Sequence, residues 1–241
     1  MPPAIPANGI SIMTSLNAEY YLTAQYPCSY IEGKLARSEV AVARTGQFGA
    51  LIRSGFRRSG LFVYRPCCDD CSACIAVRVD AARFDPNRSQ RRSFKRHASL
   101  QVRSPGLAFE LEHFELYRRY QSARHPGGGM ESEEQYRNSL LASHVHTKLY
   151  EFREEGKLVM VSIVDEIEDG LSSVYAFFDP ESRGAGLGTY NILWQIDLCK
   201  KLQLPYLYLG YWIEQSEKMA YKINFQPLEG YIGGQWQALA K

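Results

Sequence analysis

The sequence predicts an α+β fold, and three observations lead to this prediction. Three β-rich runs, TKLYEFR, KLVMVSIV and LSSVYAFF, follow one another with short turn-like links. A glycine-rich turn, a long apolar helix and a further β-rich run come next, which indicates a β-α-β crossover added to an antiparallel meander. Near the N-terminus, apolar and alternating runs flank a cysteine cluster and predict two more strands.

The N-terminal elements are short. Residues 46–55 place Phe48, Leu51 and Ile52 on one face and predict a helix, and residues 61–64 read as a strand. The run CIAVRVDAARF, which follows the cysteine cluster, alternates like a second strand. The cysteines are therefore expected on a turn between two strands, a common setting for a small metal site.

The turn SPG at residues 104–106 is the best candidate boundary between domains. It divides the chain into an N-terminal cysteine-containing domain of residues 1–104, with a basic segment, and a second domain of residues 105–241. Helical spacing in FELYRRYQSARH predicts the first helix of the second domain, which the run PGGG ends.

Two more helices are expected in the second domain. Ser132 and Gln135 have the spacing of a capping box and open one of them. The other begins after the glycine-rich turn, ends before Pro205, and is apolar on more than one face. This pattern predicts that the long helix is buried against a sheet.

The overall composition is that of an ordinary globular protein. The chain has 241 residues, 45% of them hydrophobic, and a formal net charge of +2, which by itself favours no particular partner. Neither a signal-like start nor an apolar run of about 20 residues is visible, so we expect a cytoplasmic protein that does not enter a membrane. Clustered cysteines in that compartment are more often ligands or reactive thiols than disulfides.

A basic segment covers residues 83–96, in which Asp85 is the only acidic residue. Such clustering is expected at a surface that binds a phosphate backbone, although a solvated helix face gives the same pattern. The two interpretations are equally open from these residues alone. The candidate RNA-binding residues are Arg88, Arg91, Arg92, Lys95 and Arg96.

The cysteine cluster RPCCDDCSAC gives three thiols at three-residue spacing, which Cys28 could complete to a set of four. Four sulfur ligands suit zinc or an iron–sulfur cluster. The second interpretation is that the thiols are reduced and pack the domain. A catalytic thiol is the third interpretation, because no Cys–His pair can be identified in the sequence. The candidate metal ligands are Cys28, Cys68, Cys71 and Cys74.

The glycine-rich turn resembles the R-x-x-G-x-G turn of the GNAT acyltransferase superfamily. Backbone N–H groups at such a helix start suit an anion or a developing oxyanion. No Gly-Lys-Ser/Thr follows, which excludes a P-loop, and the preceding antiparallel meander argues against a dinucleotide-binding turn. The residues concerned are Arg183, Gly184, Gly186 and Gly188.

Five stretches in order, YPCSYI, YRPCCDDCSACIAVRV, RFDPNRSQRR, YRRYQSARH and YLYLGYWIEQSEKMAYKINFQP, resemble the arginyl-tRNA–protein transferase family. The compact length is similar to its bacterial branch, the aspartate/glutamate leucyltransferases. The resemblance implies a GNAT-like aminoacyltransferase without an organic cofactor. It would move leucine from leucyl-tRNA to the N-terminal α-amino group of proteins that begin with Asp or Glu, which marks them for regulated degradation as N-degrons.

The resemblance also suggests roles for individual residues. A cation that binds the acidic N-terminal residue is expected among Arg78, Arg124, His125 and Lys218. The strand YLYLGYW offers Tyr208, and Glu214 follows it, but we assign no catalytic base to either candidate. Eukaryotic relatives hold an iron–sulfur cluster with a similarly placed cysteine set, although here Ile31 stands where their further cysteine would be.

Two alternative functions fit parts of the sequence. The glycine-rich turn alone would suit a GNAT enzyme that uses acetyl-CoA, although such an enzyme needs neither the basic segment nor the cysteines. The thiols and the basic segment alone would suit a non-catalytic tRNA-binding or redox-sensing module. The sequence leaves the oligomeric state open.

Overall fold

The computed structural model describes residues 12–240, with the exception of 16–17, 43, 125–131 and 183–185. Within them, one mixed sheet has the strand order β15-β14-β8-β13-β12-β11-β10-β9. Its strands are β8 (Ile75–Asp80), β9 (Gln101–Arg103), β10 (Thr147–Glu154), β11 (Lys157–Ile167), β12 (Gly170–Phe178), β13 (Tyr206–Trp212), β14 (Leu228–Ile232) and β15 (Gln235–Leu239).

The predicted meander and crossover are confirmed. Strands β10, β11 and β12 pair antiparallel in sequence order, and β13 then pairs with β12 in parallel. Helix α5 (Leu187–Lys201) connects β12 and β13, and ends before Pro205 as predicted. Its residues Ile192, Leu193 and Ile196 are buried against apolar side chains of the sheet, which explains why the helix is apolar over so much of its surface.

A smaller antiparallel sheet forms from the N-terminal residues, in the order β1-β2-β5-β7-β6. The predicted short helix and the strand before the cysteines are confirmed as α1 and β7, and the cysteine cluster lies between β7 and β8. The elements of this region are β1 (Ile12–Ser15), β2 (Ala18–Leu22), β5 (Ser38–Val42), α1 (Thr45–Arg53), β6 (Arg57–Ser59), β7 (Phe62–Pro66) and the separate hairpin of β3 (Tyr26–Pro27) and β4 (Leu35–Ala36).

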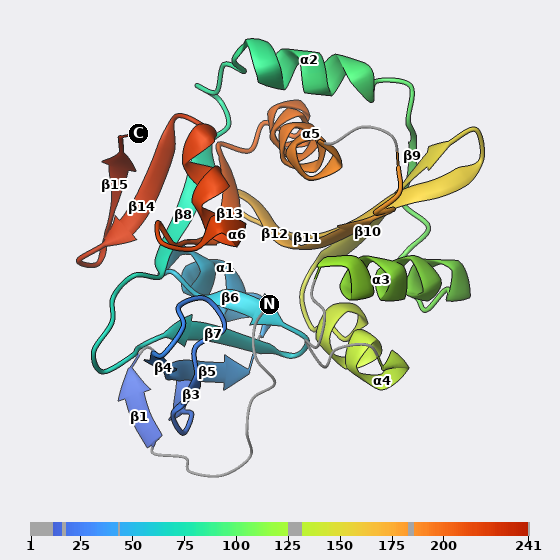
Figure 1. Ribbon diagram of the computed structural model, residues 1–241. Coiled ribbons are helices and arrows are strands. Elements are labelled where there is room, and N and C mark those ends of the chain that lie inside the picture. The colour runs from blue at the N-terminus through green and yellow to red at the C-terminus, as the bar shows by residue number, and fades with distance from the viewer. Residues whose placement is uncertain (1–11, 16–17, 43, 125–131, 183–185, 241) are drawn as a thin grey trace.

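Helices cover both faces of the large sheet (Figure 1). Helix α2 (Arg88–Arg96) and α5 lie on one face, while the smaller sheet lies on the other together with α3 (Leu111–Arg124) and α4 (Glu133–Tyr136). The remaining helical turns are a π-helix (Arg137–Leu141), α6 (Glu217–Ala220) and a 3₁₀ turn (Tyr221–Asn224). None of the described helices is long and apolar enough to span a bilayer.

The expected division at residue 104 does not separate the two sheets. Strands β8 and β9 precede that residue, yet β8 pairs with β13 and β14, and β9 pairs with β10. Helix α4 begins at the predicted cap, where the Ser132 side chain accepts a hydrogen bond from the Gln135 backbone N–H at 3.2 Å. These pairings connect distant segments, and local sequence patterns do not reveal them.

A buried ion pair joins the smaller sheet to the larger one. Arg58 in β6 donates to the Asp165 carboxylate in β11 through Nε at 2.7 Å and Nη2 at 2.9 Å. Both side chains are fully buried, and Thr147 Oγ1 donates to the same carboxylate at 2.6 Å. The pair therefore fixes the position of β6 over β11.

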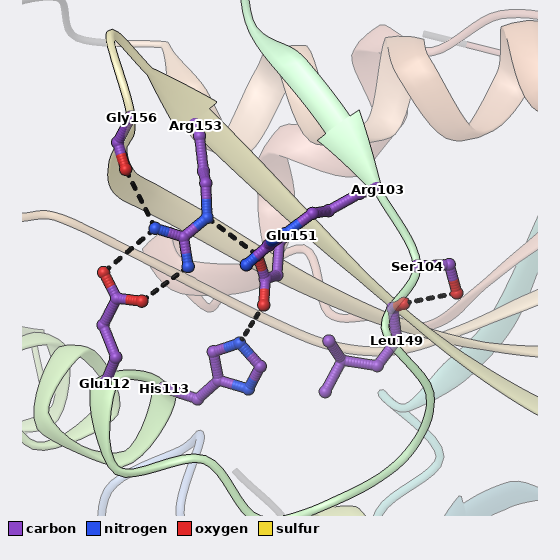
Figure 2. A network of polar contacts seen from close by, with 8 residues as sticks. All are labelled: Arg103, Ser104, Glu112, His113, Leu149, Glu151, Arg153 and Gly156. Atoms are coloured by element: carbon purple, nitrogen blue, oxygen red, sulfur yellow. Dashed lines mark hydrogen bonds and ion pairs between the residues drawn. The ribbon is translucent and has the colours of Figure 1, made fainter.

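A second polar network holds α3 against the edge of the large sheet (Figure 2). The buried Glu151 carboxylate of β10 accepts from Arg103 at 2.5 Å and from Arg153 at 2.8 Å, and lies 2.8 Å from the His113 ring. Burial raises the pKa of Glu151, but these three partners outweigh it and hold the pKa at about 2.

Replacement of Glu151 by Gln should therefore make stability less sensitive to acid. The depressed pKa stabilises the folded protein above the unfolded-state value of about 4.5, and this contribution disappears as the pH falls toward 2. We expect Glu151→Gln to lower the free energy of unfolding by about 3 kcal/mol at pH 7 and by roughly half as much or less at pH 3. Urea unfolding at both pH values measures the difference; the exposed Glu115→Gln is the control. An equal loss at both pH values would contradict the prediction.

Candidate functional site

The parallel strands β12 and β13 separate along their length. They pair only from Gly170 opposite Tyr206 to Ser172 opposite Tyr208, although both strands continue for several residues. Beyond that point β13 has an irregularity in its pairing with β8, and Gly210 has a φ of 75°, a conformation that favours glycine. The carboxyl halves of the two strands are therefore not joined by backbone pairing, which leaves space for a side chain to enter between them.

The Arg57 side chain enters this space from β6. Its Nη2 donates to the backbone carbonyl of Val174 in β12 at 3.0 Å. On the β13 side, a Cβ built on Gly210 would lie 1.8 Å from Arg57 Nη1. The guanidinium therefore touches both strands, and only glycine leaves room for it at position 210.

The surroundings of Arg57 are largely aromatic. Burial raises the pKa values of Tyr30, Tyr64 and Tyr211, and the neighbouring Arg57 charge partly counteracts it at each phenol. The Lys222 amine is also close: burial lowers its pKa well below the usual value, and the Arg57 charge lowers it further. Sequence reasoning missed this cluster, and the glycine in the middle of YLYLGYW was the available signal of a close approach.

Arg78, one of the predicted substrate-binding cations, is engaged in the fold. It donates to Glu229 at 2.7 Å and to the Tyr208 hydroxyl at 3.2 Å, and its guanidinium stacks on Tyr206 at 3.6 Å from the ring centroid. Its charge is already neutralised by Glu229. The geometry therefore favours a structural role for Arg78.

The other predicted binding residues lie on the surface or outside the described part of the chain. Arg124 is exposed at the end of α3, with its guanidinium 5.8 Å from the Phe178 ring centroid, and Lys218 is exposed on α6. His125 lies outside the described residues. Of the four predicted cations, none is therefore seen to enter the space between β12 and β13.

The two candidate bases differ in environment. Tyr208 donates its hydroxyl proton to Asp169 at 2.9 Å, and burial, followed by the Asp169 charge, raises its pKa well above the usual value. A buried phenol in this network is a poor proton acceptor, which disfavours Tyr208. Glu214 is exposed just beyond β13. A catalytic role for Glu214 stays a prediction.

The last part of the glycine-rich turn, Gly186, leads into α5 and lies beside α2. Gly186 is the N-cap of α5 with a φ of 133°, and a Cβ built there would lie 3.2 Å from Ser93 Oγ of α2. Gly188 lies in the first turn of the helix, while Arg183 and Gly184 are outside the described residues. The start of α5 at Gly186 and the basic helix predicted from sequence are therefore neighbours.

Helix α2 presents its basic residues to solvent. Arg88, Arg92 and Lys95 are exposed and share one helix face, and none of them has a carboxylate within ion-pair distance in the described part of the protein. Gln90 and the half-buried Phe94 occupy the opposite side, where Phe94 packs on Tyr190 of α5. An anionic partner would therefore meet a row of available cations.

The two glycines of the turn should respond differently to substitution by Ala. At Gly186 the backbone conformation is one that other residues rarely adopt, so we expect Gly186→Ala to cost about 1–3 kcal/mol of stability. At Gly188 the new methyl group would meet the Phe178 ring at 3.6 Å, an ordinary contact, so Gly188→Ala should be neutral or slightly stabilising. Chemical denaturation compares the pair, and equal effects would show that the conformation of Gly186 is not limiting.

The four predicted metal ligands line one small cavity of about 30 Å³, together with Tyr30, Tyr64 and Tyr211. Burial first, and then the neighbouring thiols of Cys68, Cys28 and Cys71, raise the pKa of Cys74 to about 12. Their sulfur atoms have the chemistry that zinc and iron–sulfur clusters prefer. Even so, no group of three or more His, Cys, Asp or Glu among the described residues is arranged to hold a metal ion.

The other two cysteines are separate from this cavity. Burial, and after it the Glu39 charge, raises the pKa of Cys67 to about 11. Cys199 is fully buried in α5 and packs in the core, as its position in an apolar helix indicates.

Comparison with known proteins identifies relatives over most of the chain. A family model described as "Arginine-tRNA-protein transferase, N terminus" matches residues 26–92, and its C-terminus counterpart matches residues 112–232. The "Aspartate/glutamate leucyltransferase" of Nitrosospira multiformis is 56% identical over 92% of this chain and 90% of its own length. The protein of the same name from Thiobacillus denitrificans is 54% identical over 92% and 95%.

A solved structure shares the fold at low sequence identity. It is the C-terminal domain of an Agrobacterium fabrum protein assigned as a lysylphosphatidylglycerol synthetase, with a TM-score of 0.50 and 12% identity over 85% of this chain and 70% of that chain. This likeness concerns the fold alone. The two family models and relatives that share half of their residues across nearly the whole length establish the ancestry: the chain belongs to the arginine-tRNA-protein transferase family.

Proposed function

We propose that this protein transfers leucine from leucyl-tRNA to the N-terminal α-amino group of proteins that begin with Asp or Glu. The observation that carries the proposal is 56% and 54% identity, over 92% of the chain, to two proteins named aspartate/glutamate leucyltransferase. The product has an N-terminal leucine, which we propose marks it for regulated degradation.

The arrangement of the strands supports an acyltransferase of the GNAT type. An antiparallel meander, a crossover helix and a parallel strand pair that separates toward its carboxyl end are the parts of that architecture. We propose that the acyl donor and the amine acceptor meet between β12 and β13.

The chemistry needs no covalent enzyme intermediate. The acceptor nitrogen forms a bond to the leucyl carbonyl carbon, the ester bond to the tRNA ribose breaks, and a proton passes from the amine to the departing ribose oxygen. The ester is already activated, and an α-amine with a pKa of about 7.7–8.0 is partly neutral near pH 7. Positioning of the two substrates is therefore the main task of the protein.

Helix α2 and the start of α5, which are neighbours, would have complementary tasks in this reaction. The exposed cations of α2 would hold the tRNA backbone, and the start of α5 would present backbone N–H groups to the developing oxyanion. The proximity of Gly186 to Ser93 of α2 supports this arrangement, because the two elements lie side by side.

The proposed function can be tested with purified protein and radiolabelled aminoacyl-tRNA. Leucyl-tRNA and arginyl-tRNA are supplied separately with model proteins that begin with Asp, Glu or Ala, and acetyl-CoA is tested in a parallel reaction. We expect leucine incorporation on Asp and Glu only. Arginine incorporation without leucine would overturn the proposed branch, and acetylation alone would support an ordinary GNAT enzyme.

We also propose that Cys28, Cys68, Cys71 and Cys74 hold zinc or an iron–sulfur cluster, on the basis of their shared cavity and sulfur chemistry. Anaerobically purified protein should contain near-stoichiometric zinc, or iron with sulfide. Cys74→Ser should lose the metal and lower the melting temperature, whereas Cys67→Ser should retain it, because Cys67 does not line the cavity. Metal-free wild-type protein would contradict this proposal, and the thiols would then be reduced packing residues.

A further inference from the structure

We propose that Arg57 is the residue that recognises the acidic N-terminal side chain of the acceptor, by binding its carboxylate between β12 and β13. This inference rests on the proposed function and adds to it the group that sets acceptor specificity. The residue comes from β6 of the smaller sheet, outside the motifs from which the substrate-binding cations were predicted.

The first argument is charge. Arg57 is half-buried, and in the described part of the protein it has no carboxylate within ion-pair distance. Lys222 does not add a second unpaired charge, because burial lowers its pKa well below the usual value and its amine donates to the Tyr211 backbone carbonyl at 2.5 Å. Partly buried charges in proteins are normally paired, since desolvation of an unpaired charge is costly. The Arg57 guanidinium is therefore suited to an anion supplied by a ligand.

The second argument is the shape of the guanidinium. Arg57 uses Nη2 to hold the Val174 carbonyl at 3.0 Å, which fixes the orientation of the planar group and leaves further N–H donors available. A guanidinium presents paired donors that match the two oxygens of a carboxylate. The position of Arg57 against both strands places a bound carboxylate at the point where the strands separate.

The third argument distinguishes the acceptor from the tRNA. Helix α2, with its exposed cations, lies on the α5 face of the large sheet, whereas β6 lies on the opposite face; Figure 1 shows the positions of the two elements. A phosphate backbone held by α2 would approach from one side, and an anion bound by Arg57 from the other. We therefore assign the Arg57 anion to the acceptor side chain.

The fourth argument is a comparison with Arg78, the cation predicted from the strand after the thiols. Within the described residues, the charge of Arg78 is neutralised, whereas that of Arg57 is not. Arg78 is neutralised by Glu229 at 2.7 Å and is covered by aromatic rings. Arg57 has aromatic neighbours too, but no carboxylate among the described residues neutralises it: it donates to the Val174 backbone carbonyl and interacts with the Tyr64 phenol, and both groups are uncharged.

The test is a comparison of matched acceptors. Model peptides that begin with Asp, Asn, Glu or Gln are leucylated by wild-type protein and by Arg57→Gln. We expect the preference for each acid over its amide, measured as kcat/KM, to fall about 10- to 100-fold in Arg57→Gln, chiefly through KM for the acid. The affinity for leucyl-tRNA should stay the same. Arg44→Gln, an exposed arginine at the start of α1, is the control and should keep the wild-type preference.

A second variant keeps the test informative if Arg57→Gln does not fold. Arg57→Lys retains the charge but not the paired donors, so it should keep part of the preference for the acids. A folded Arg57→Gln or Arg57→Lys protein with the full preference would overturn the inference, as would a loss of tRNA affinity with unchanged preference. If wild-type protein leucylates no acceptor, the proposed function fails as well; if it is selective and the variants are equally selective, only the role of Arg57 fails.

Discussion

Replacement of Arg58 by Met should lower the free energy of unfolding by about 3–5 kcal/mol, the largest stability effect that we expect for a single substitution. Among the described residues, the change leaves the buried Asp165 carboxylate with the Thr147 hydroxyl as its remaining side-chain donor. It also removes the link between β6 and β11. Guanidinium chloride unfolding measures the loss; Lys201→Met, which breaks an exposed pair with Asp197, should cost less than about 1 kcal/mol.

A double substitution separates the cost of an unpaired charge from the cost of lost packing. If the isolated Asp165 carboxylate causes most of the loss, Arg58→Met combined with Asp165→Leu should recover much of the stability. A single variant as stable as the wild type would show that the buried pair contributes little. In that case another contact would have to fix β6.

Simultaneous replacement of Arg88, Arg92 and Lys95 by Ala should weaken leucyl-tRNA binding by about 10- to 100-fold at moderate salt. These side chains form one exposed face of α2, and each phosphate contact that they make releases counterions. The slope of log affinity against log salt should become shallower by about two units. Filter binding at several salt concentrations measures both quantities.

A control with the same change of net charge makes this result specific. Arg44, Lys148 and Lys201 are exposed cations on other elements, and their replacement by Ala should leave the salt slope almost unchanged. If the two triple variants behave alike, the effect comes from overall charge. If neither changes affinity, α2 presents a solvated face and the RNA lies elsewhere.

The sequence was informative wherever a structural pattern is local. The meander and the crossover follow from β-rich runs, turn residues and an apolar helix, and each of these signals lies within about 20 residues of chain. The prediction that Cys28 joins the three evenly spaced thiols was less local, because Cys28 lies far from them along the chain. The shared cavity places the four together, although their arrangement does not form a metal site in the described residues.

Contacts between distant segments limited the prediction of the site. Arg78 follows the thiols and was expected to meet the substrate, but its partner Glu229 comes from β14, which no local spacing relates to β8. Arg57 and Arg58 are consecutive and identical in type, yet one reaches β12 and the other β11. Composition cannot separate these two roles, because they depend on which face of the strand each side chain occupies.

The turn between β6 and β7 has a practical consequence for engineering the protein. Hairpin tips usually tolerate inserted tags, but Gly60 donates its N–H to Ser139 at 2.8 Å, and a Cβ built on it would lie 2.1 Å from the Asn138 carbonyl oxygen. An epitope placed there would push the tip off the π-helix and disturb both arginines of β6. Gly233 and Gly234, between β14 and β15, have open space around them, so this tip is the better place for a fluorescent label or an affinity tag.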